Sequence, residues 1–274
     1  MNICSGIWPI TKRCGRQMSN SVLEFQKVNF KYESDKTQSE SILKNMSFQI
    51  NDGEFISIIG PSGSGKSTIF RLITGLEQPN SGDILINGEV TSDRLGSVGY
   101  MPQQDLLMPW RSIMDNATLP LEIKGIRKEE AQSRVSKLLV DFGLKGVENL
   151  FPGDLSGGMK QRVSFLRTIL SGSNILLLDE PFSALDAITR LTMQEWLLEQ
   201  WTKMEKTILF ITHDVDEALF LSDRIFVTGQ KPITTIQEVK VPLGRPRVLR
   251  DLGHPEVIEL KEQLIGQLRA GVKI

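Results

Sequence analysis

Apolar and polar residues alternate with a period of two in the first part of the chain, over residues 22–32 and again over residues 42–50. Such alternation is typical of β-strands that are buried on one face only, as in antiparallel sheets. The polar run at residues 33–41 predicts a turn between the two segments. The first part of the chain is therefore expected to form an antiparallel β unit.

A second kind of apolar segment is short and nearly continuous, as at residues 55–59, 98–101, 175–178 and 208–211. Runs of this kind fit strands that are buried on both faces. Each is followed by polar residues and a helical pattern, and the first leads through a glycine-rich turn into a helix predicted over residues 67–75. Strands that alternate with helices predict an α/β fold with a mostly parallel sheet, covered on both faces.

Residues 111–150 follow a different pattern. Apolar positions between residues 128 and 139 recur at the spacing of an amphipathic helix. This predicts a helical lobe, spanning about residues 104–165, that is inserted between strands of the α/β core. Beyond a further strand at residues 224–228, a proline-interrupted stretch precedes a last helix, predicted over residues 256–268.

The composition narrows the possible functions mainly by exclusion. Of 274 residues, 32 are Lys or Arg and 33 are Asp or Glu, so the net charge is -1 and the basic excess of many nucleic-acid binders is absent. The longest apolar runs are far shorter than the roughly 18–20 residues of a membrane-spanning helix, so the chain is not expected to cross a bilayer. Both cysteines, Cys4 and Cys14, lie near the N-terminus, so no disulfide framework is expected in the body of the chain.

The N-terminal stretch has the reverse order of a secretory signal, because its apolar part at residues 3–10 precedes its basic residues. A recognisable strand pattern begins only after Met18. We therefore expect residues 1–20 to form a flexible tail and residues 21–274 to form one domain. Residues 1–17 are either a loose tail or the result of a start codon placed upstream of the true one at Met18.

A glycine-rich turn follows the apolar run at residues 55–59 and fits the P-loop pattern G-x-x-x-x-G-K-[ST] at every fixed position. Its glycines let successive backbone N–H groups point at phosphate oxygens, and the following helix adds the positive end of its dipole. Lys66 is expected to reach the β- and γ-phosphates, and the Ser67 hydroxyl to bind Mg²⁺. A chance glycine-rich turn with a lysine does not account for the strand before it and the helix after it. The residues expected to bind ATP here are Gly60, Pro61, Ser62, Gly63, Ser64, Gly65, Lys66, Ser67 and Thr68.

Two acidic residues, Asp179 and Glu180, directly follow the apolar run at residues 175–178. In open α/β sheets ligands bind beyond the carboxyl ends of the strands, which is where both acids fall. Asp179 is expected to hold Mg²⁺, and Glu180 to orient or deprotonate an attacking water. A phosphoryl-transfer site needs both tasks beside its P-loop. The alternative is an acidic strand end that is simply exposed to solvent.

Residues 155–162, with the sequence LSGGMKQR, begin a predicted helix. Ser156 is a good N-cap, but a plain helix start does not explain the adjacent Gly157 and Gly158, whereas close approach of the backbone to an anion would. The segment resembles the LSGGQ signature of the ABC transporter ATPase family, with Met159 in place of glutamine. Serine and the glycine backbone make the main phosphate contacts in that family. The resemblance therefore implies that ATP also binds at Ser156, Gly157 and Gly158.

The resemblance covers about residues 22–270, and its further motifs follow in the family's order. It implies that Gln103 contacts the metal and the attacking water and senses a membrane permease, with Gln104 as the weaker alternative. Asp186 resembles the aspartate of the D-loop, which crosses the interface between two copies. The fold of the family is that of a P-loop NTPase with a RecA-like, mostly parallel core, an antiparallel β subdomain and an inserted α-helical subdomain.

Two further residues take their expected roles from the same resemblance. His213 resembles the switch histidine that contacts the γ-phosphate, and Tyr32 resembles the aromatic residue that stacks on adenine. Taken alone, a histidine at a strand end is more often a satisfied polar group, and a tyrosine there is more often part of the packing.

The family implies ATP and Mg²⁺ as cofactors and a head-to-tail pair of two copies. Each ATP lies between the P-loop of one copy and the signature of the other. The resemblance also implies a peripheral subunit on the cytoplasmic face of the cell membrane, bound to transmembrane permease subunits. An extracellular solute-binding protein would be an indirect partner, and no nucleic acid is expected.

Residues 105–116 and 241–247 resemble the nitrate, sulfonate and taurine importer branch, whose relatives also carry pyrimidine precursors of thiamine. They predict ATP-driven uptake of a small solute. The alternatives are an exporter subunit, a soluble ABC ATPase that acts on nucleic acid, ribosomes or cluster assembly, and a binding module without hydrolysis. Glu180 argues against the last of these.

Overall fold

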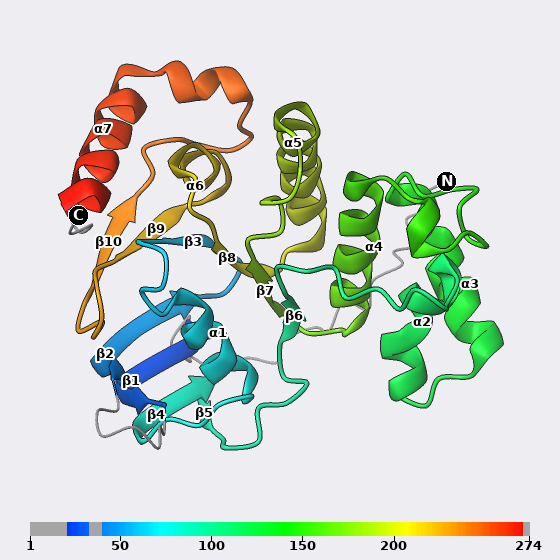
Figure 1. Ribbon diagram of the computed structural model, residues 1–274, viewed down its shortest axis with the longest axis horizontal. Helices are drawn as coiled ribbons and strands as arrows, with labels where there is room; N and C mark the ends of the chain where they lie inside the picture. Colours follow the sequence, from blue (N-terminus) through cyan, green and yellow to red (C-terminus); the bar gives the residue numbers. More distant parts are fainter. Residues whose placement is uncertain (1–20, 33–39, 271–274) are drawn as a thin grey trace, which may run out of the picture.

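The computed structural model describes residues 21–32 and 40–270. The tail expected over residues 1–20, with Met18, and most of the turn predicted at residues 33–41 lie outside the described residues. Within them the chain forms two β-sheets, helices that cover the larger sheet, and further helices, α2 (Ile113–Ile123) and α3 (Lys128–Asp141), that lie beside it (Figure 1).

The smaller sheet is antiparallel and has the strand order β2-β1-β4-β5. The larger sheet has the order β10-β9-β3-β8-β7-β6, in which the pairs from β9 to β6 are parallel and β10 is antiparallel to β9. The strands are β1 (Ser21–Lys31), β2 (Ser41–Asn51), β3 (Phe55–Ile59), β4 (Ser81–Ile86), β5 (Glu89–Val90), β6 (Gly99–Met101), β7 (Ile175–Asp179), β8 (Thr207–Ile211), β9 (Arg224–Thr228) and β10 (Ile236–Lys240). The mostly parallel core and the antiparallel β unit predicted from the sequence are both present.

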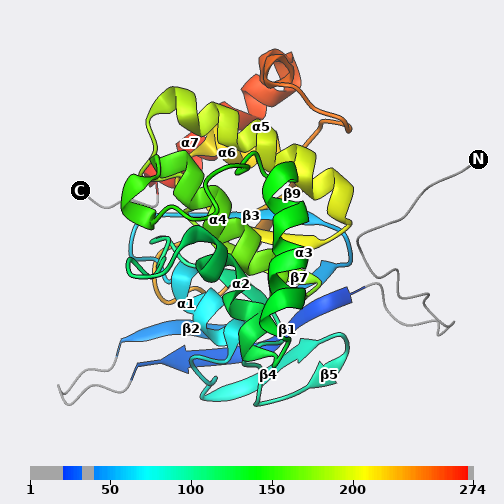
Figure 2. The same cartoon turned by 90° about the vertical axis from the view of Figure 1, so that its right-hand side faces the viewer.

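The helices are α1 (Lys66–Thr74), α2 (Ile113–Ile123), α3 (Lys128–Asp141), α4 (Gly157–Leu170), α5 (Ala187–Met204), α6 (Val215–Leu221) and α7 (Pro255–Ala270), with two short 3₁₀ helices, η1 (Pro152–Asp154) and η2 (Leu249–Gly253). Figure 1 shows α2, α3 and α4 grouped on the right, and in Figure 2 the same three helices face the viewer. All three lie between β6 and β7 in the chain. None of the helices in the described ranges is long and apolar enough to cross a membrane.

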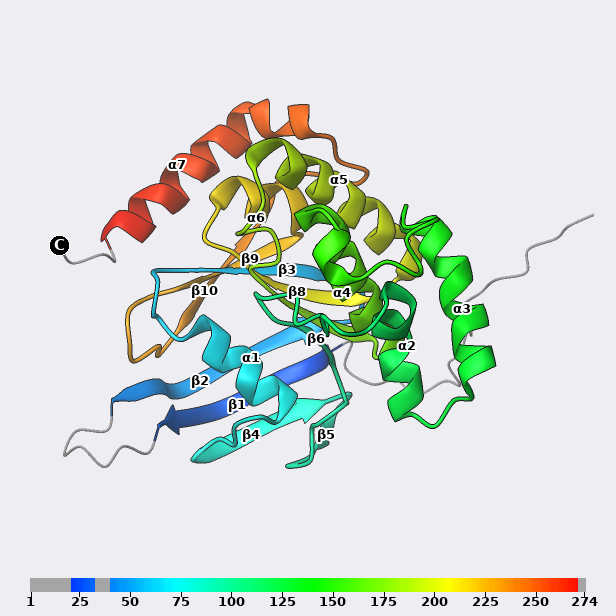
Figure 3. The ribbon, with the colours of Figure 1, turned by 45° about the vertical axis from the view of Figure 1, so that its right-hand side comes forward.

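The core strands pack on both faces, which explains their nearly continuous apolar sequences. In β7, Leu176 and Leu178 pack in the hydrophobic cluster of α4 and α5, whereas Ile175 and Leu177 pack with α1 and the antiparallel sheet. Figure 3 shows α1 between the two sheets, and α5, α6 and α7 on the opposite side of the core sheet. Because full burial of such a side chain contributes about 1.5–3 kcal/mol, a polar residue at Leu177 would destabilise the sheet.

Three strands are absent from the sequence prediction, namely β4, β5 and β10. β5 has only two residues, both exposed, and β10 is an edge strand with two residues, Gln237 and Glu238, exposed in succession. Their apolar alternation is weak, so they become strands through pairing with β1, β4 and β9 rather than through local pattern. The parallel strands, in contrast, end at one edge of the sheet, where the loops after β3, β6, β7 and β8 meet.

Candidate functional site

The P-loop after β3 requires glycine for steric reasons at three positions. A Cβ on Gly60 would lie 2.0 Å from Thr228 Oγ1, and a Cβ on Gly65 would lie 2.6 Å from Ile42 Cγ2. Gly63 and Gly65 also have positive φ angles of 73° and 108°, which side chains disfavour. The loop can therefore take this tight path only with this glycine spacing.

The start of α1 lies open at the end of this loop. Its N-cap, Gly65, provides no side-chain hydrogen bond, so the first N–H groups of the helix have no side-chain cap and can donate to an anion. The Lys66 side chain turns back over the loop, and its Nζ donates to the carbonyl oxygens of Gly60 at 2.9 Å and Pro61 at 3.0 Å. Burial lowers the pKa of Lys66, which is 7% exposed, while the carboxylates of Glu180 and Asp179 act in the opposite direction.

Ser67 and Asp179 meet at the edge between α1 and β7. Ser67 Oγ donates to Asp179 Oδ1 at 3.4 Å, and the Tyr100 hydroxyl donates to Asp179 Oδ2 at 3.5 Å. Both bonds are long, although Asp179 is only 6% exposed and its burial raises the pKa of the carboxyl. A buried carboxylate with weak partners favours a cation beside it, and hydroxyl plus carboxylate oxygens suit Mg²⁺. The described part of the chain has no group of three His, Cys, Asp or Glu side chains that could hold a metal ion, so phosphate or water would complete the shell of a metal bound here.

Residues from three loops meet at Glu180. Its φ of 44° lies in the left-handed region, a strained conformation for glutamate, and its N–H donates to the Ile211 carbonyl oxygen at 3.0 Å. Gln103 Nε2, from the loop after β6, donates to Glu180 Oε2 at 3.1 Å. His213 Nδ1, from the loop after β8, lies 3.4 Å from the same oxygen. The three residues predicted to be catalytic are thus in contact, at the strand edge that carries the P-loop.

Two residues at this centre were not identified from the sequence. Ser183 Oγ donates to the Glu180 carbonyl oxygen at 2.9 Å and accepts from Gln103 Nε2 at 3.4 Å. Tyr100, at the end of β6, faces Asp179, and burial followed by that carboxylate raises the pKa of its hydroxyl to about 12. Only their places near the ends of β6 and β7 could have indicated them, because serine and tyrosine are common in loops and packing.

Tyr32 lies beside the helix of the P-loop. Its hydroxyl is 3.3 Å from Thr68 Oγ1, and its ring contacts Phe30 edge to face at 4.9 Å between centroids. Tyr32 is nevertheless 38% exposed. Packing against Phe30 therefore accounts for the buried part of the Tyr32 side chain. The exposed part can stack on a planar ligand at the P-loop.

The signature residues stand apart from the P-loop within this chain. Ser156 caps α4, since its Oγ accepts from Met159 N at 3.4 Å. A Cβ on Gly157 would lie 3.1 Å from Leu185 Cδ2, and a Cβ on Gly158 would lie 3.1 Å from Thr189 Cγ2. A side chain at either position would therefore approach a neighbouring side chain of the same chain closely, which the sequence did not suggest. Among the described residues no hydrogen bond joins this segment to the P-loop.

Asp186 follows Leu185 and begins α5. Its Oδ1 accepts from Ile188 N at 3.2 Å and Thr189 N at 3.0 Å, and its hydrogen bonds to Thr189 hold the pKa of its carboxyl below the usual value. Asp186 itself is exposed. The loop expected to act as the D-loop is therefore fixed by helix capping next to Gly157 and Gly158.

The segment at residues 105–116 is organised by the fully buried Asn116. Its side chain accepts from Met108 N at 2.8 Å and donates to the carbonyl oxygens of Met108, Arg111 and Ser112. The loop so formed leaves Trp110 75% exposed. Ordinary packing therefore does not explain this tryptophan, although it explains Leu107, which is buried.

Comparison with known proteins places this geometry in a family. Residues 43–183 match the model of the ABC transporter family. The chain is 43% identical over 256 residues to the formylaminopyrimidine import ATP-binding protein ThiZ of Halalkalibacterium halodurans, covering 93% of this chain and 96% of that protein. It is 40% identical over 219 residues to the aliphatic sulfonates import ATP-binding protein SsuB of Bacillus cereus, covering 79% and 86%.

Solved structures agree with these relatives. A dimeric, post-hydrolysis structure of the ATP-binding cassette MJ0796, bound to ADP and phosphate, has a TM-score of 0.69 and 30% identity, and covers 81% of this chain and 100% of that chain. The cbiO1 structure from Clostridium perfringens shares the fold, with a TM-score of 0.72 at 24% identity, covering 92% and 100%. The P-loop, the acidic edge beside it and these relatives show that the chain belongs to the ABC transporter family, as one of its ATP-binding, ATP-hydrolysing proteins.

Proposed function

We propose that this chain hydrolyses ATP to drive the uptake of a small polar solute through a membrane permease. The observation that supports hydrolysis most directly is the meeting of Gln103 and His213 on the carboxylate of Glu180 beside the P-loop. A strained backbone that aims a carboxylate at such a point is typical of catalytic positions. Import is supported by the names of the two relatives, both import ATP-binding proteins.

Each of the site residues has a separate proposed role in the reaction. Lys66 and the N–H groups of the P-loop bind the phosphates, and Tyr32 stacks on the adenine. Ser67 and Asp179 hold Mg²⁺, which neutralises charge on the phosphates when bound. Glu180 accepts a proton from the water that attacks the γ-phosphorus, and His213 contacts the γ-phosphate as ADP leaves.

Gln103 carries two expected roles that the structure supports unequally. Its amide donates to Glu180 and Ser183, which suits contact with the attacking water. A role as metal ligand requires the same side chain to turn towards Ser67 and Asp179. We therefore propose water contact as its first role and metal contact as a second one, adopted with nucleotide bound.

Two copies complete each site. Within one chain the signature packs on the D-loop and α5 rather than on the P-loop. We propose that Ser156, Gly157 and Gly158 of one copy bind the γ-phosphate held by the P-loop of the other, with Asp186 at the interface. A negative charge between two helix N-termini holds the pair together until hydrolysis removes it. The dimeric state of the MJ0796 cassette supports this arrangement.

The permease is proposed to bind the helical segment at residues 104–165. Exposed apolar residues gather in its loops, and Ile113 N donates to Leu150 O at 2.8 Å, so that the loop with Phe151 lies near the one with Trp110. Large exposed aromatic residues in neighbouring loops are typical of protein interfaces. The subunit would then lie on the cytoplasmic face of the membrane, while an extracellular binding protein delivers a solute of the formylaminopyrimidine or sulfonate class.

The test has two steps. The purified chain should hydrolyse ATP in the presence of Mg²⁺, and a tagged chain isolated from detergent-treated membranes should bring a multi-span membrane protein with it. ATP hydrolysis in the extract should rise when the matching solute and its binding protein are added. Recovery of the tagged chain only with ribosomes or nucleic acid would overturn transport.

A further inference from the structure

Arg190 and Gln194 lie one turn apart on α5 and share one face of that helix. Arg190 Nη2 donates to the carbonyl oxygen of Leu185 in the D-loop at 3.0 Å. Its Nη1 lies 4.0 Å from Asp214 Oδ2, at the start of α6. One guanidinium therefore spans the gap between the D-loop and the loop that carries His213.

Gln194 makes the second link across the same gap. Its Nε2 donates to Glu217 Oε1 at 2.9 Å, and Thr212 Oγ1 donates to Glu217 Oε2 at 2.5 Å. All three side chains are buried, so each is held by these bonds rather than by water. Asp214 N in turn donates to Thr212 Oγ1 at 2.9 Å.

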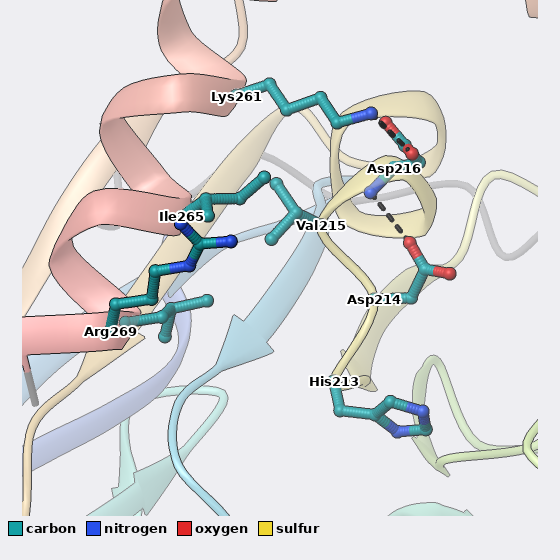
Figure 4. A pocket seen from close by; sticks show the side chains of 8 residues that line it. His213, Asp214, Val215, Asp216, Lys261, Ile265 and Arg269 are labelled. Atoms are coloured by element: carbon teal, nitrogen blue, oxygen red, sulfur yellow. Dashed lines mark hydrogen bonds and ion pairs between the residues drawn. The ribbon is translucent and has the colours of Figure 1, made fainter. Parts of the chain in front are cut away.

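His213 lies between two residues, Thr212 and Asp214, that both belong to this network. Asp214 also caps α6, because its Oδ1 accepts from Asp216 N at 2.8 Å and Glu217 N at 3.2 Å. Figure 4 shows His213 preceding this capped turn, with its imidazole pointing away from α7. The side chains on either side of His213 are thus linked to α5, that of Asp214 directly and that of Thr212 through Glu217.

The other side of the same turn borders open space. A cavity of about 750 Å³ lies between residues 213–216 and α7, with Val215, Ile265, Leu268 and Arg269 in its wall (Figure 4). The far end of α6 is firmly held, because Arg247 Nη1 donates to the carbonyl oxygens of Leu219, Phe220 and Ser222. The first turn of α6 is also bonded to α7, because Lys261 Nζ donates to Asp216 Oδ2 at 2.7 Å. Both α5 and α7 therefore hold this turn, but of these bonds only those from α5 reach the residues directly before and after His213.

We propose that Arg190 and Gln194 are positioning residues for His213, and that they couple its place to the Leu185–Asp186 loop. This inference rests on the proposed function, in which a second copy contacts that loop. Docking of the second copy would shift the Leu185 carbonyl, and Arg190 would carry that shift to Asp214 and hence to His213. Hydrolysis would then be favoured only in the closed pair.

The first test compares Arg190→Ala, Arg190→Lys and Lys203→Ala. Lys203 serves as the control because it lies on the same helix in an exposed ion pair with Glu199. Arg190→Ala should lower kcat about tenfold, because a shift of the His213 imidazole by less than about 1 Å is expected to cost that much. KM and ATP affinity should stay within about twofold of the wild-type values. Arg190→Lys should recover part of kcat, and Lys203→Ala should change nothing.

A spectroscopic readout separates positioning from general damage. His213 and His254 are the only histidines of the chain, so their Cε1–H resonances can be assigned with His254→Gln. Arg190→Ala should shift the His213 resonance and leave that of His254 in place. If Arg190→Ala does not fold, Gln194→Met decides, with an expected loss of about threefold in kcat and the same shift. An unmoved His213 resonance, or an unchanged kcat, would overturn the inference.

Coupling to the D-loop is tested by combining Arg190→Ala with Asp186→Ala. If Arg190 and Asp186 act on His213 through the same contacts, the double variant should have a kcat close to that of the single variant with the lower kcat. Multiplied losses would show that the two residues act separately. Failure of the wild-type chain to hydrolyse ATP would refute the proposed function, whereas the His213 resonance tests the network without any turnover.

Discussion

The P-loop and the signature both combine a helix N-terminus with closely spaced glycines, yet they are built differently. In the P-loop, Gly63 and Gly65 have positive φ angles, and α1 begins without a side-chain cap. In the signature, Gly157 and Gly158 lie in regular helix, and the Ser156 hydroxyl occupies the helix end as its cap. The first is an open nest of N–H groups, and the second is a closed helix start packed on its own chain.

In the proposed dimer, this difference would make the contributions of the two helix starts to one phosphate unequal. The P-loop offers several backbone donors and Lys66, so it can bind nucleotide within a single copy. The signature offers a serine that is already weakly engaged, at 3.4 Å from Met159 N. Its contribution should therefore appear in turnover and in pairing rather than in the first binding of ATP. Four predictions examine this contrast.

The largest effect is expected from a change that leaves both helix starts intact. Glu180→Gln removes the carboxylate proposed to take the proton of the attacking water, so turnover should fall by at least about 100-fold. ATP binding should persist, and size-exclusion chromatography with ATP should show a stable dimer. Glu54→Gln is a suitable control, because Glu54 pairs with Arg224 before β3, away from the P-loop edge. Normal turnover in Glu180→Gln would remove Glu180 from its role.

Ser156→Arg changes only the signature side. A large cation in place of the cap should obstruct the shared site, and turnover should fall by about 100-fold while the affinity of one copy for ATP stays within about twofold. Ser112→Arg is the matched control, since Ser112 caps α2 in the same way, by accepting from Asp115 N. Equal losses of turnover in both variants would point to cap removal instead of a shared site.

Lys66→Ala changes only the P-loop side. Loss of a charged hydrogen bond of about 1.5–3 kcal/mol predicts a nucleotide affinity that is about 10- to 100-fold weaker, measured by titration with ATP. Lys206→Ala removes another buried lysine, one that donates to the Ser173 carbonyl oxygen, and should leave the affinity unchanged. An unaltered affinity in Lys66→Ala would contradict the binding role of the loop.

The smallest effects are expected in the free energy of unfolding, when a methyl group is added to one glycine of the P-loop or to one glycine of the signature. Gly60→Ala forces a contact with Thr228 and should destabilise the fold by about 1–3 kcal/mol. Gly158→Ala meets Thr189 at 3.1 Å, but alanine favours helix by about 1 kcal/mol, so the net change should lie near zero. Denaturant midpoints measure both. A larger loss in Gly158→Ala would mean that the signature is the more tightly packed of the two.

Local pattern predicted the elements that have strong periodicity. The apolar runs of β3, β7 and β8 were predicted within a residue, as were the start of α1 and the cap of α4 at Ser156. The edge strand β10 and the short β5 were missed, because they depend on pairing with distant strands. The predicted site residues Gln103, Glu180 and His213 do meet, whereas Ser183 and Arg190 carry no local signal.

The amino-acid order alone determined the phosphate loop, the acidic strand end and the family, since these depend on residue types at short, regular spacing. Only the tertiary structure decided that Glu180 is held at a φ of 44°, that Gln103 and His213 share its carboxylate, and that the signature glycines pack on Leu185 and Thr189. These contacts join segments far apart in the chain. They follow from parallel strands ending at one edge of a sheet, which no local pattern encodes.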